Sequence, residues 1–204
     1  MKLPQKIIFL SLFTLLLTSC VEPSGNKKNN TLLNTDFELI RVNNQYSIEL
    51  PTFMKESEDL NEDASLEYQN IFKETYTIVI DESKEDFISA FKDLGEFNES
   101  LSIAKNYKNI QLQFLGEEVS ISRAEDIESS TINGLPFEIT EVDATIDGID
   151  IGYTLAFVEG ENYVYMVMAW TLQNKHDKYR DLFQKIVKSF KVISRRKGVK
   201  KSVN

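Results

Sequence analysis

The chain has 204 residues, 42% of them hydrophobic, with 13 Phe and 8 Tyr. This is enough apolar material for one folded domain, and it excludes a wholly disordered chain. One Cys excludes a disulfide framework, and one His, at position 176, leaves little room for a His-based metal centre. The net charge of −9 argues against nucleic-acid binding through a basic surface. We therefore expect no nucleic-acid partner, no metal site and no cofactor.

Residues 1–19 have the pattern of a secretory signal. Lys2 and Lys6 precede an apolar run from Ile7 to Leu17. As a helix, this run would rise about 16 Å, well short of the roughly 30 Å hydrocarbon core of a bilayer. A cleaved leader is therefore predicted here in place of a membrane-spanning helix.

The end of this leader, Leu17-Thr18-Ser19-Cys20, resembles the lipobox of bacterial lipoproteins: an aliphatic residue, two small residues, then cysteine. The resemblance implies a diacylglyceryl group on the Cys20 sulfur and cleavage before Cys20. Two or three acyl chains hold a protein stably at a membrane. The predicted partner is thus membrane lipid, through acylated Cys20, and the predicted location is the bacterial cell envelope. The alternative is an ordinary leader with an incidental Cys.

In the enterobacterial sorting rule, Asp directly after the acylated Cys directs retention in the inner membrane. The residue at this position is Val21. By similarity to that rule, an outer membrane is favoured in a Gram-negative organism.

The rest of the chain divides into a lipid-anchored tether at 20–36, a single domain at 37–193 and a basic tail at 194–204. The tether is rich in Asn and has few apolar residues beyond Leu32 and Leu33, and as a flexible coil of about 15 residues it would reach roughly 20 Å. Without Lys2 and Lys6 the net charge becomes −11, and from Lys188 onward the chain has seven positive and no negative residues. The tail could contact anionic lipid or polysaccharide, or serve only to solubilise the chain.

The first part of the domain is predicted to hold three short strands, near 46–50, 65–70 and 73–80, with an acidic loop at 54–63. Ser83 followed by Asp86 resembles a capping box that opens a helix, and Gly95 can close it. A second helix is predicted from Asn98 to Phe114, with Gly116 after it.

A meander of four strands follows, near 120–132, 135–146, 149–158 and 163–171. Asn133-Gly134 and Asp147-Gly148 are two-residue hairpin signals between them. The last of these strands is apolar at both alternating sets of positions, which predicts cover on both faces. A final helix is marked by the spacing of Tyr179, Leu182, Phe183, Ile186, Val187 and Phe190. The predicted fold class is α+β, an antiparallel sheet of about six to seven strands with helices packed on both faces.

This order of elements, the turn Asn133-Gly134 followed by Pro136, and the helix end Ile186-Val-Lys-Ser-Phe190 resemble PsbP-type domains over residues 37–193. The resemblance implies an antiparallel sheet sandwiched between helices. PsbP serves the oxygen-evolving complex, and a related fold binds the small GTPase Ran. The resemblance thus implies a binding or assembly-supporting module, more a non-enzyme than an enzyme. It assigns no functional residue of this chain.

Other chemically capable residues have simpler structural interpretations. His176 is expected to be solvent-exposed just before the final helix. The segment from Asp143 to Gly148 mimics half of an EF-hand loop but lacks the Glu at position 12, so a hairpin turn explains it better. The remaining candidates are expected in a solvated acidic loop or in the core of the last strand: Glu56, Glu58, Asp59, Glu62 and Asp63 in the loop, and Tyr163, Tyr165 and Trp170 in the strand.

The sequence therefore favours a membrane-anchored envelope lipoprotein that binds an unidentified protein or small ligand. No catalytic residue is predicted. The alternative is a cell-envelope hydrolase that uses acidic residues, which requires a concave pocket holding a carboxylate pair of raised pKa.

Overall fold

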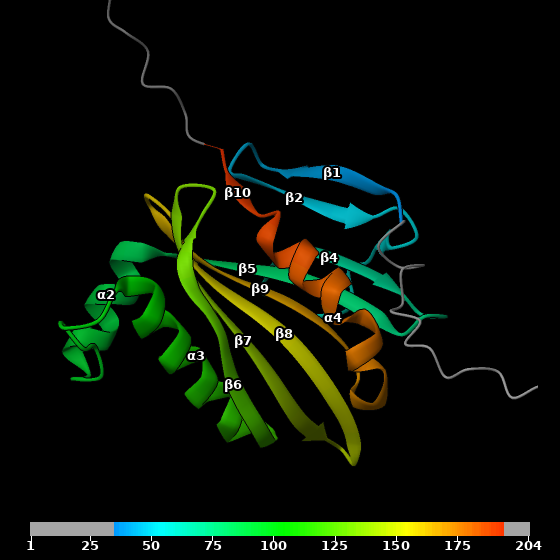
Figure 1. Ribbon diagram of the computed structural model, residues 1–204. Helices are drawn as coiled ribbons and strands as arrows, with labels where there is room; N and C mark the ends of the chain where they lie inside the picture. The colour runs from blue at the N-terminus through cyan, green and yellow to red at the C-terminus, as the bar shows by residue number, and fades with distance from the viewer. Residues whose placement is uncertain (1–34, 194–204) are drawn as a thin grey trace, which may run out of the picture.

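The computed structural model describes residues 35–193 (Figure 1). The predicted leader, Cys20, nearly all of the predicted tether and the tail at 194–204 lie outside the described residues. Within 35–193, no helix is both long and apolar enough to cross a bilayer.

The centre of the domain is a seven-stranded antiparallel sheet in the order β3-β4-β5-β9-β8-β7-β6. Its strands have these bounds: β3 Lys55–Glu56, β4 Ala64–Asn70, β5 Thr75–Ser83, β6 Ser120–Ile132, β7 Leu135–Ile146, β8 Ile149–Glu159 and β9 Tyr163–Leu172. Both predicted hairpin turns are present. Their residues, Asn133-Gly134 and Asp147-Gly148, all have φ between 52° and 82°, the left-handed conformation that such turns need. The antiparallel sheet and its meander are thus confirmed.

A second sheet of three strands lies beside the first: β1 Phe37–Val42, β2 Tyr46–Pro51 and β10 Lys191–Val192. The sequence predicted only β2. β1 is an outer strand with no fully buried side chain, so its apolar residues do not alternate cleanly. β10 has only two residues, too few for any periodicity.

The helices are α2 Lys84–Asp93, α3 Ile103–Glu118 and α4 Gln173–Lys188. α2 is capped as predicted, because the Ser83 hydroxyl accepts from the Asp86 amide and Gly95 has φ +75°. The predicted bounds of α3 were wrong. The Asn106 side chain holds residues 98–102 in a turn, so the helix begins after its Ser102 cap, and Gly116 lies inside the helix.

The buried side chains form two hydrophobic clusters. One joins α4 and β2 to the sheet and includes Tyr165 and Val167 of β9. The other joins α2 and α3 to the sheet and includes Val164 and Met166 of β9. Because successive residues of a strand point to opposite faces, the two clusters use opposite faces of β9.

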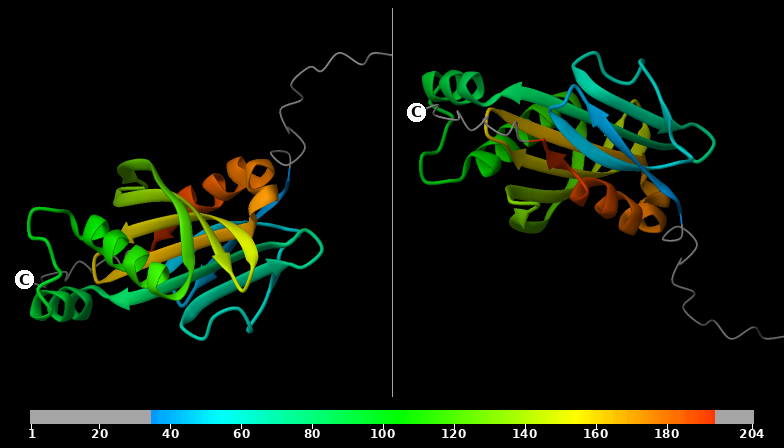
Figure 2. Two further views of the ribbon diagram at one scale, coloured as in Figure 1. Left: turned by 90° about the horizontal axis from the view of Figure 1, so that it is seen from below. Right: turned by 90° about the horizontal axis from the view of Figure 1, so that it is seen from above.

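The long sheet has two ends that differ in what they carry (Figure 2). The hairpin end holds the β4–β5 turn at 71–74, the β7–β8 turn at 147–148 and the start of α4. The pocket end holds the β8–β9 turn at 160–162 and the start of α2. These two ends are about ten residues of strand apart.

Candidate functional site

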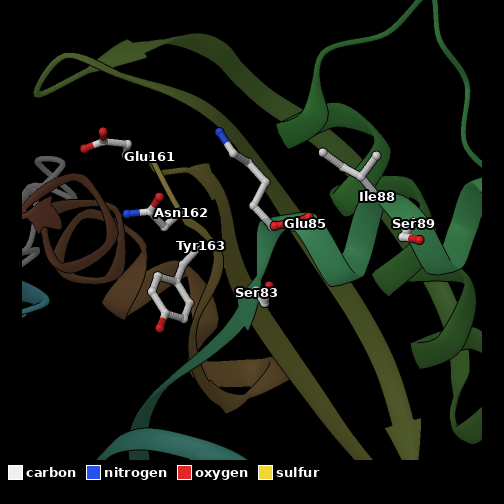
Figure 3. A pocket seen from close by; sticks show the side chains of 8 residues that line it. Ser83, Glu85, Ile88, Ser89, Glu161, Asn162 and Tyr163 are labelled. Carbon is white, nitrogen blue, oxygen red and sulfur yellow. The ribbon is translucent and has the colours of Figure 1, made fainter.

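An open pocket of about 590 Å³ lies at the pocket end, between the first turns of α2 and the β8–β9 turn (Figure 3). Ile88 and Tyr163 give it apolar surface, and Glu85 and Glu161 give it carboxylates. The remaining lining residues are Ser83, Lys84, Ser89 and Asn162. This mixture suits an amphipathic or cationic group that places an apolar part against Tyr163 and a polar or positive part near the carboxylates.

The pocket is built by Lys84, which ties the β8–β9 turn to α2. The Lys84 amide donates to the Asn162 carbonyl at 2.9 Å, and the Lys84 ammonium donates to the Gly160 carbonyl at 2.9 Å. The same ammonium lies 3.5 Å from the Glu159 carboxylate. These bonds occupy the ammonium, so it fixes the rim and is not free to bind an anion.

Tyr163 is 38% exposed and lines the pocket, whereas the sequence placed it in the core. That prediction was wrong for Tyr163 and right for Tyr165, which is buried. Tyr163 is the first residue of β9 and lies beside the turn, beyond the packed centre of the strand. The alternation of apolar residues does not show at which residue of a strand the packing of other elements against it ends.

The prediction for His176 was also wrong, because this side chain is buried. Its Nε2 lies 3.1 Å from the Thr154 hydroxyl, and its ring centroid lies 6.0 Å from that of Phe183. α4 begins three residues before His176, at Gln173, and Leu172 at its N-cap provides no side-chain cap. Because the sequence has no capping residue at this position, the start of the helix could not be predicted from it. The spacing of His176 from Tyr179 and Phe183, three and seven residues, already placed it on the buried stripe.

Burial lowers the pKa of His176 below its ordinary 6.5. The negative charge of Glu141 opposes this shift, and the positive charge of Arg180 adds to it. The unfolded chain therefore binds a proton that the folded chain does not. We expect the free energy of unfolding to decrease as pH falls through 6.5 toward the lowered value. Urea unfolding at about pH 7.5 and about pH 5.5 measures this decrease. His176→Gln should show a smaller decrease, and an equal one would contradict the assignment.

Near His176, an ion-pair network joins α4 to β6 and β7. The buried Glu141 carboxylate accepts from Arg180 Nε at 3.0 and 3.2 Å, and Arg123 lies 3.6 Å from it. Arg123 also donates to Asp143 at 2.7 Å. Each charged group here is satisfied by another group of the fold, so the network is structural.

A second buried pair joins α3 to β6 and β7 on the opposite face. The Lys108 ammonium lies 2.6 Å from Asp126 and 3.9 Å from the buried Glu138, which also accepts from the Ser129 hydroxyl at 2.7 Å. The hydrogen bond from Lys108 lowers the pKa of Asp126. This pair also serves the packing of a helix on the sheet.

The acidic residues of the 54–63 segment are exposed, as predicted, although Glu56 belongs to the short strand β3. Asp147-Gly148 forms the β7–β8 turn, which confirms the hairpin interpretation of the EF-hand-like segment. Among residues 35–193, no cluster of three or more His, Cys, Asp or Glu side chains is arranged to hold a metal ion.

Comparison of the chain with protein families and with curated proteins gives no match. Among solved structures, cyanobacterial PsbP from Synechocystis sp. PCC 6803 is similar, with a TM-score of 0.51 and 10% identity over 78% of this chain and 93% of that one. The Ran-binding protein Mog1p of Saccharomyces cerevisiae has a TM-score of 0.45 and 10% identity, covering 78% of this chain and 97% of its own.

LpqN, which is involved in cell envelope biogenesis of Mycobacterium tuberculosis, has a TM-score of 0.45 and 11% identity, covering 78% and 91%. Of the three, the cyanobacterial PsbP structure is similar enough to compare folds. The described domain has an α+β fold like that of PsbP.

Proposed function

We propose that the chain is a cell-envelope lipoprotein, held at the membrane by acylated Cys20, whose domain acts as a binding or assembly-supporting module through the pocket beside α2. The observation that supports this is the place of the pocket in the molecule. It lies at the end of the domain opposite to the end where the chain enters from the predicted lipid anchor.

The entry point is given by hydrogen bonds around Asp36. The Thr52 amide donates to the Asp36 carbonyl at 2.9 Å, and the Asn70 side chain donates to the neighbouring Phe53 carbonyl at 2.7 Å. Asn70 is the last residue of β4, so the chain enters at the hairpin end. A lipid anchor on that side leaves the pocket at the far end of the domain, accessible to a ligand or partner.

The rigidity of the pocket supports a binding role. We infer a sandwich in which α4 covers one face of the sheet and α2 and α3 the other, because the two hydrophobic clusters use opposite sets of β9 side chains. Residues on such a scaffold keep their positions, which lowers the entropic cost of binding. Since the next residue is Val21, an outer membrane is the proposed location in a Gram-negative organism.

The alternative, a hydrolase that uses acidic residues, gains no support from the pocket. Glu85 and Glu161 are both exposed to solvent, whereas a general acid needs a desolvated carboxyl group. Hydrogen bonds from Lys108 and Lys188 lower the pKa of Asp126 and of Glu128, the opposite of the raised pKa that a general acid needs. The binding module is therefore the better proposal.

A photoreactive phenylalanine at Tyr163 tests this function in the cells that make the protein. After irradiation, we expect a defined adduct in the membrane fraction, which Ile88→Asp should weaken by changing the opposite wall. The control position is Leu39, which is 44% exposed on β1, far from the pocket. Equal adducts at both positions would contradict the pocket as the binding site.

Cys20→Ser should move the protein out of the membrane fraction, and its retention there would contradict the anchor.

A further inference from the structure

The β4–β5 turn at the hairpin end exposes two large apolar side chains side by side. Ile71 is 66% exposed and Phe72 is 99% exposed. The turn that presents them is fixed: the Lys73 amide donates to the Asn70 side chain at 2.8 Å, and the Glu74 amide donates to the Ile71 carbonyl at 3.2 Å. A fully exposed phenylalanine on a fixed turn gives the folded domain no packing energy of its own.

Three lysines lie near the base of this turn. The Lys73 ammonium lies 5.1 Å from the centre of the Phe53 ring, Lys175 at the start of α4 pairs with Glu74, and the Lys55 ammonium donates to the Thr52 carbonyl at 3.2 Å. An apolar tip with lysines behind it is typical of segments at a bilayer surface. There the aromatic ring lies at the headgroup level, and lysine stems extend their charges into water.

The same turn lies beside the point where the chain enters the domain. Phe53 connects the two, because its carbonyl accepts from Asn70 while the preceding Thr52 bonds to Asp36. Asp36 comes sixteen positions after Cys20 in the sequence, with fifteen residues between them. Even fully extended they span at most about 55 Å, and as a coil roughly 20 Å. A domain anchored at Cys20 therefore has this turn within reach of the bilayer.

We propose that Ile71 and Phe72 form a wedge that inserts into the surface of the bilayer that holds the acyl chains of Cys20. This inference rests on the proposed lipid anchor. The acyl chains provide residence at the membrane, and the wedge adds a second contact that fixes the orientation of the domain. With the hairpin end at the lipid, the pocket beside α2 lies at the end of the sheet farther from it. Figure 2 shows α2 and the β4–β5 turn at opposite ends of the sheet.

A spin label at the tip tests the wedge directly. Because Cys20 is the only cysteine and its sulfur is acylated in the anchored protein, Phe72→Cys introduces a single free thiol. The acylated protein, labelled there with a nitroxide, is reconstituted in vesicles of phosphatidylethanolamine and phosphatidylglycerol. We expect severalfold more collisions with oxygen, which is enriched in lipid, than with a water-soluble nickel chelate.

The matched control is Leu94→Cys, at the end of α2, where the native side chain is 67% exposed at the pocket end of the molecule. Its label should collide mostly with the nickel chelate. Equal behaviour of the two labels would overturn the wedge while leaving the anchor intact. Protection of the label at position 72 from both reagents would indicate a covering protein and would also overturn it.

Failure of the anchor would be seen separately, as a protein that has no acyl mass and is recovered in the soluble fraction. The unacylated full chain then tests the wedge alone, by flotation with the same vesicles. Phe72→Ser should lower its partitioning about tenfold, since part of a large aromatic surface no longer leaves water. Leu94→Ser should leave partitioning unchanged. An equal effect of the two substitutions would overturn the wedge in this case as well.

Discussion

Replacing Gly152 with alanine should lower the free energy of unfolding by about 3 kcal/mol, near the upper end of the cost of overpacking a core. Gly152 lies in β8 directly beneath α4. A Cβ at this position would lie 2.6 Å from the Cβ and 2.7 Å from the Cγ of His176. His176 and the two residues it contacts, Thr154 and Phe183, are buried, so α4 would have to move away from the sheet. Urea unfolding measures the loss.

Two second-site variants separate this overlap from a general effect of the substitution. His176→Ala should rescue only part of the Gly152→Ala loss, because it removes the Cγ and Cδ2 contacts at 2.7 and 3.0 Å but keeps the Cβ contact at 2.6 Å. His176→Gly should rescue most of the loss, less about 1 kcal/mol for glycine in a helix. The absence of rescue by either variant would contradict the contact as the cause.

Gly116→Ala in α3 is the matched control. The nearest atom to a Cβ at this position is Ile121 Cδ1 at 3.6 Å, an ordinary contact. Alanine should therefore be neutral or stabilise the protein by up to about 1 kcal/mol, because it favours the helix. The two glycines differ in how closely another side chain approaches them. A destabilisation of similar size at both would show that the packing of α4 on Gly152 does not cause the loss.

Gly152 also shows what the sequence can and cannot predict. Apolar periodicity and the turns Asn133-Gly134 and Asp147-Gly148 predict the bounds of β6 to β9 to within one residue, because each signal is local. The predicted strand at 73–80 begins two residues before β5 and ends three residues before it does. The close approach of α4 depends on three small or short residues of β8 that face it, Gly152, Thr154 and Ala156. The sequence pattern of a strand does not show which of its small residues have a helix packed closely against them.

The candidate site could be predicted only in part, for the same reason. The Ser83 cap of α2 is visible in the sequence as a local pattern. The pocket beside it requires the β8–β9 turn, which lies about 80 residues later and is joined to α2 by Lys84. Likewise, Ile71 and Phe72 fall between two predicted strands, and their exposure follows only from the turn that presents them.

Lys108→Met should destabilise the protein by about 3 kcal/mol, the second large effect expected. Lys108 is buried, and its ammonium is the positive partner of the buried Glu138. Methionine fills a similar volume but leaves the Glu138 carboxylate with only the Ser129 hydroxyl as a partner. Removing one member of a buried pair costs more than the pair contributes, because the remaining charge keeps its desolvation penalty.

The double variant Lys108→Met with Glu138→Gln should recover most of this loss, since it leaves no unpaired charge in the core. Lys92→Met is the matched control. The Lys92 ammonium lies 2.6 Å from the Glu99 carboxylate, as the Lys108 ammonium does from Asp126, but both Lys92 and Glu99 are exposed. An exposed pair of this kind contributes at most about 1 kcal/mol. Losses of equal size at Lys92 and Lys108 would contradict burial as the cause.

The pH dependence of the Lys108→Met variant tests the other contact of this ammonium, its hydrogen bond to Asp126. In the wild type, the hydrogen bond from Lys108 lowers the pKa of Asp126 below 3.8. A lowered carboxyl pKa adds stability above the unfolded value, and that stability is lost as pH falls through the lowered value. The variant lacks this contribution at every pH. Its deficit relative to wild type should therefore be largest near neutral pH and should decrease below about 3.8. Since the Asp126 side chain is mostly exposed, its share of this decrease is small.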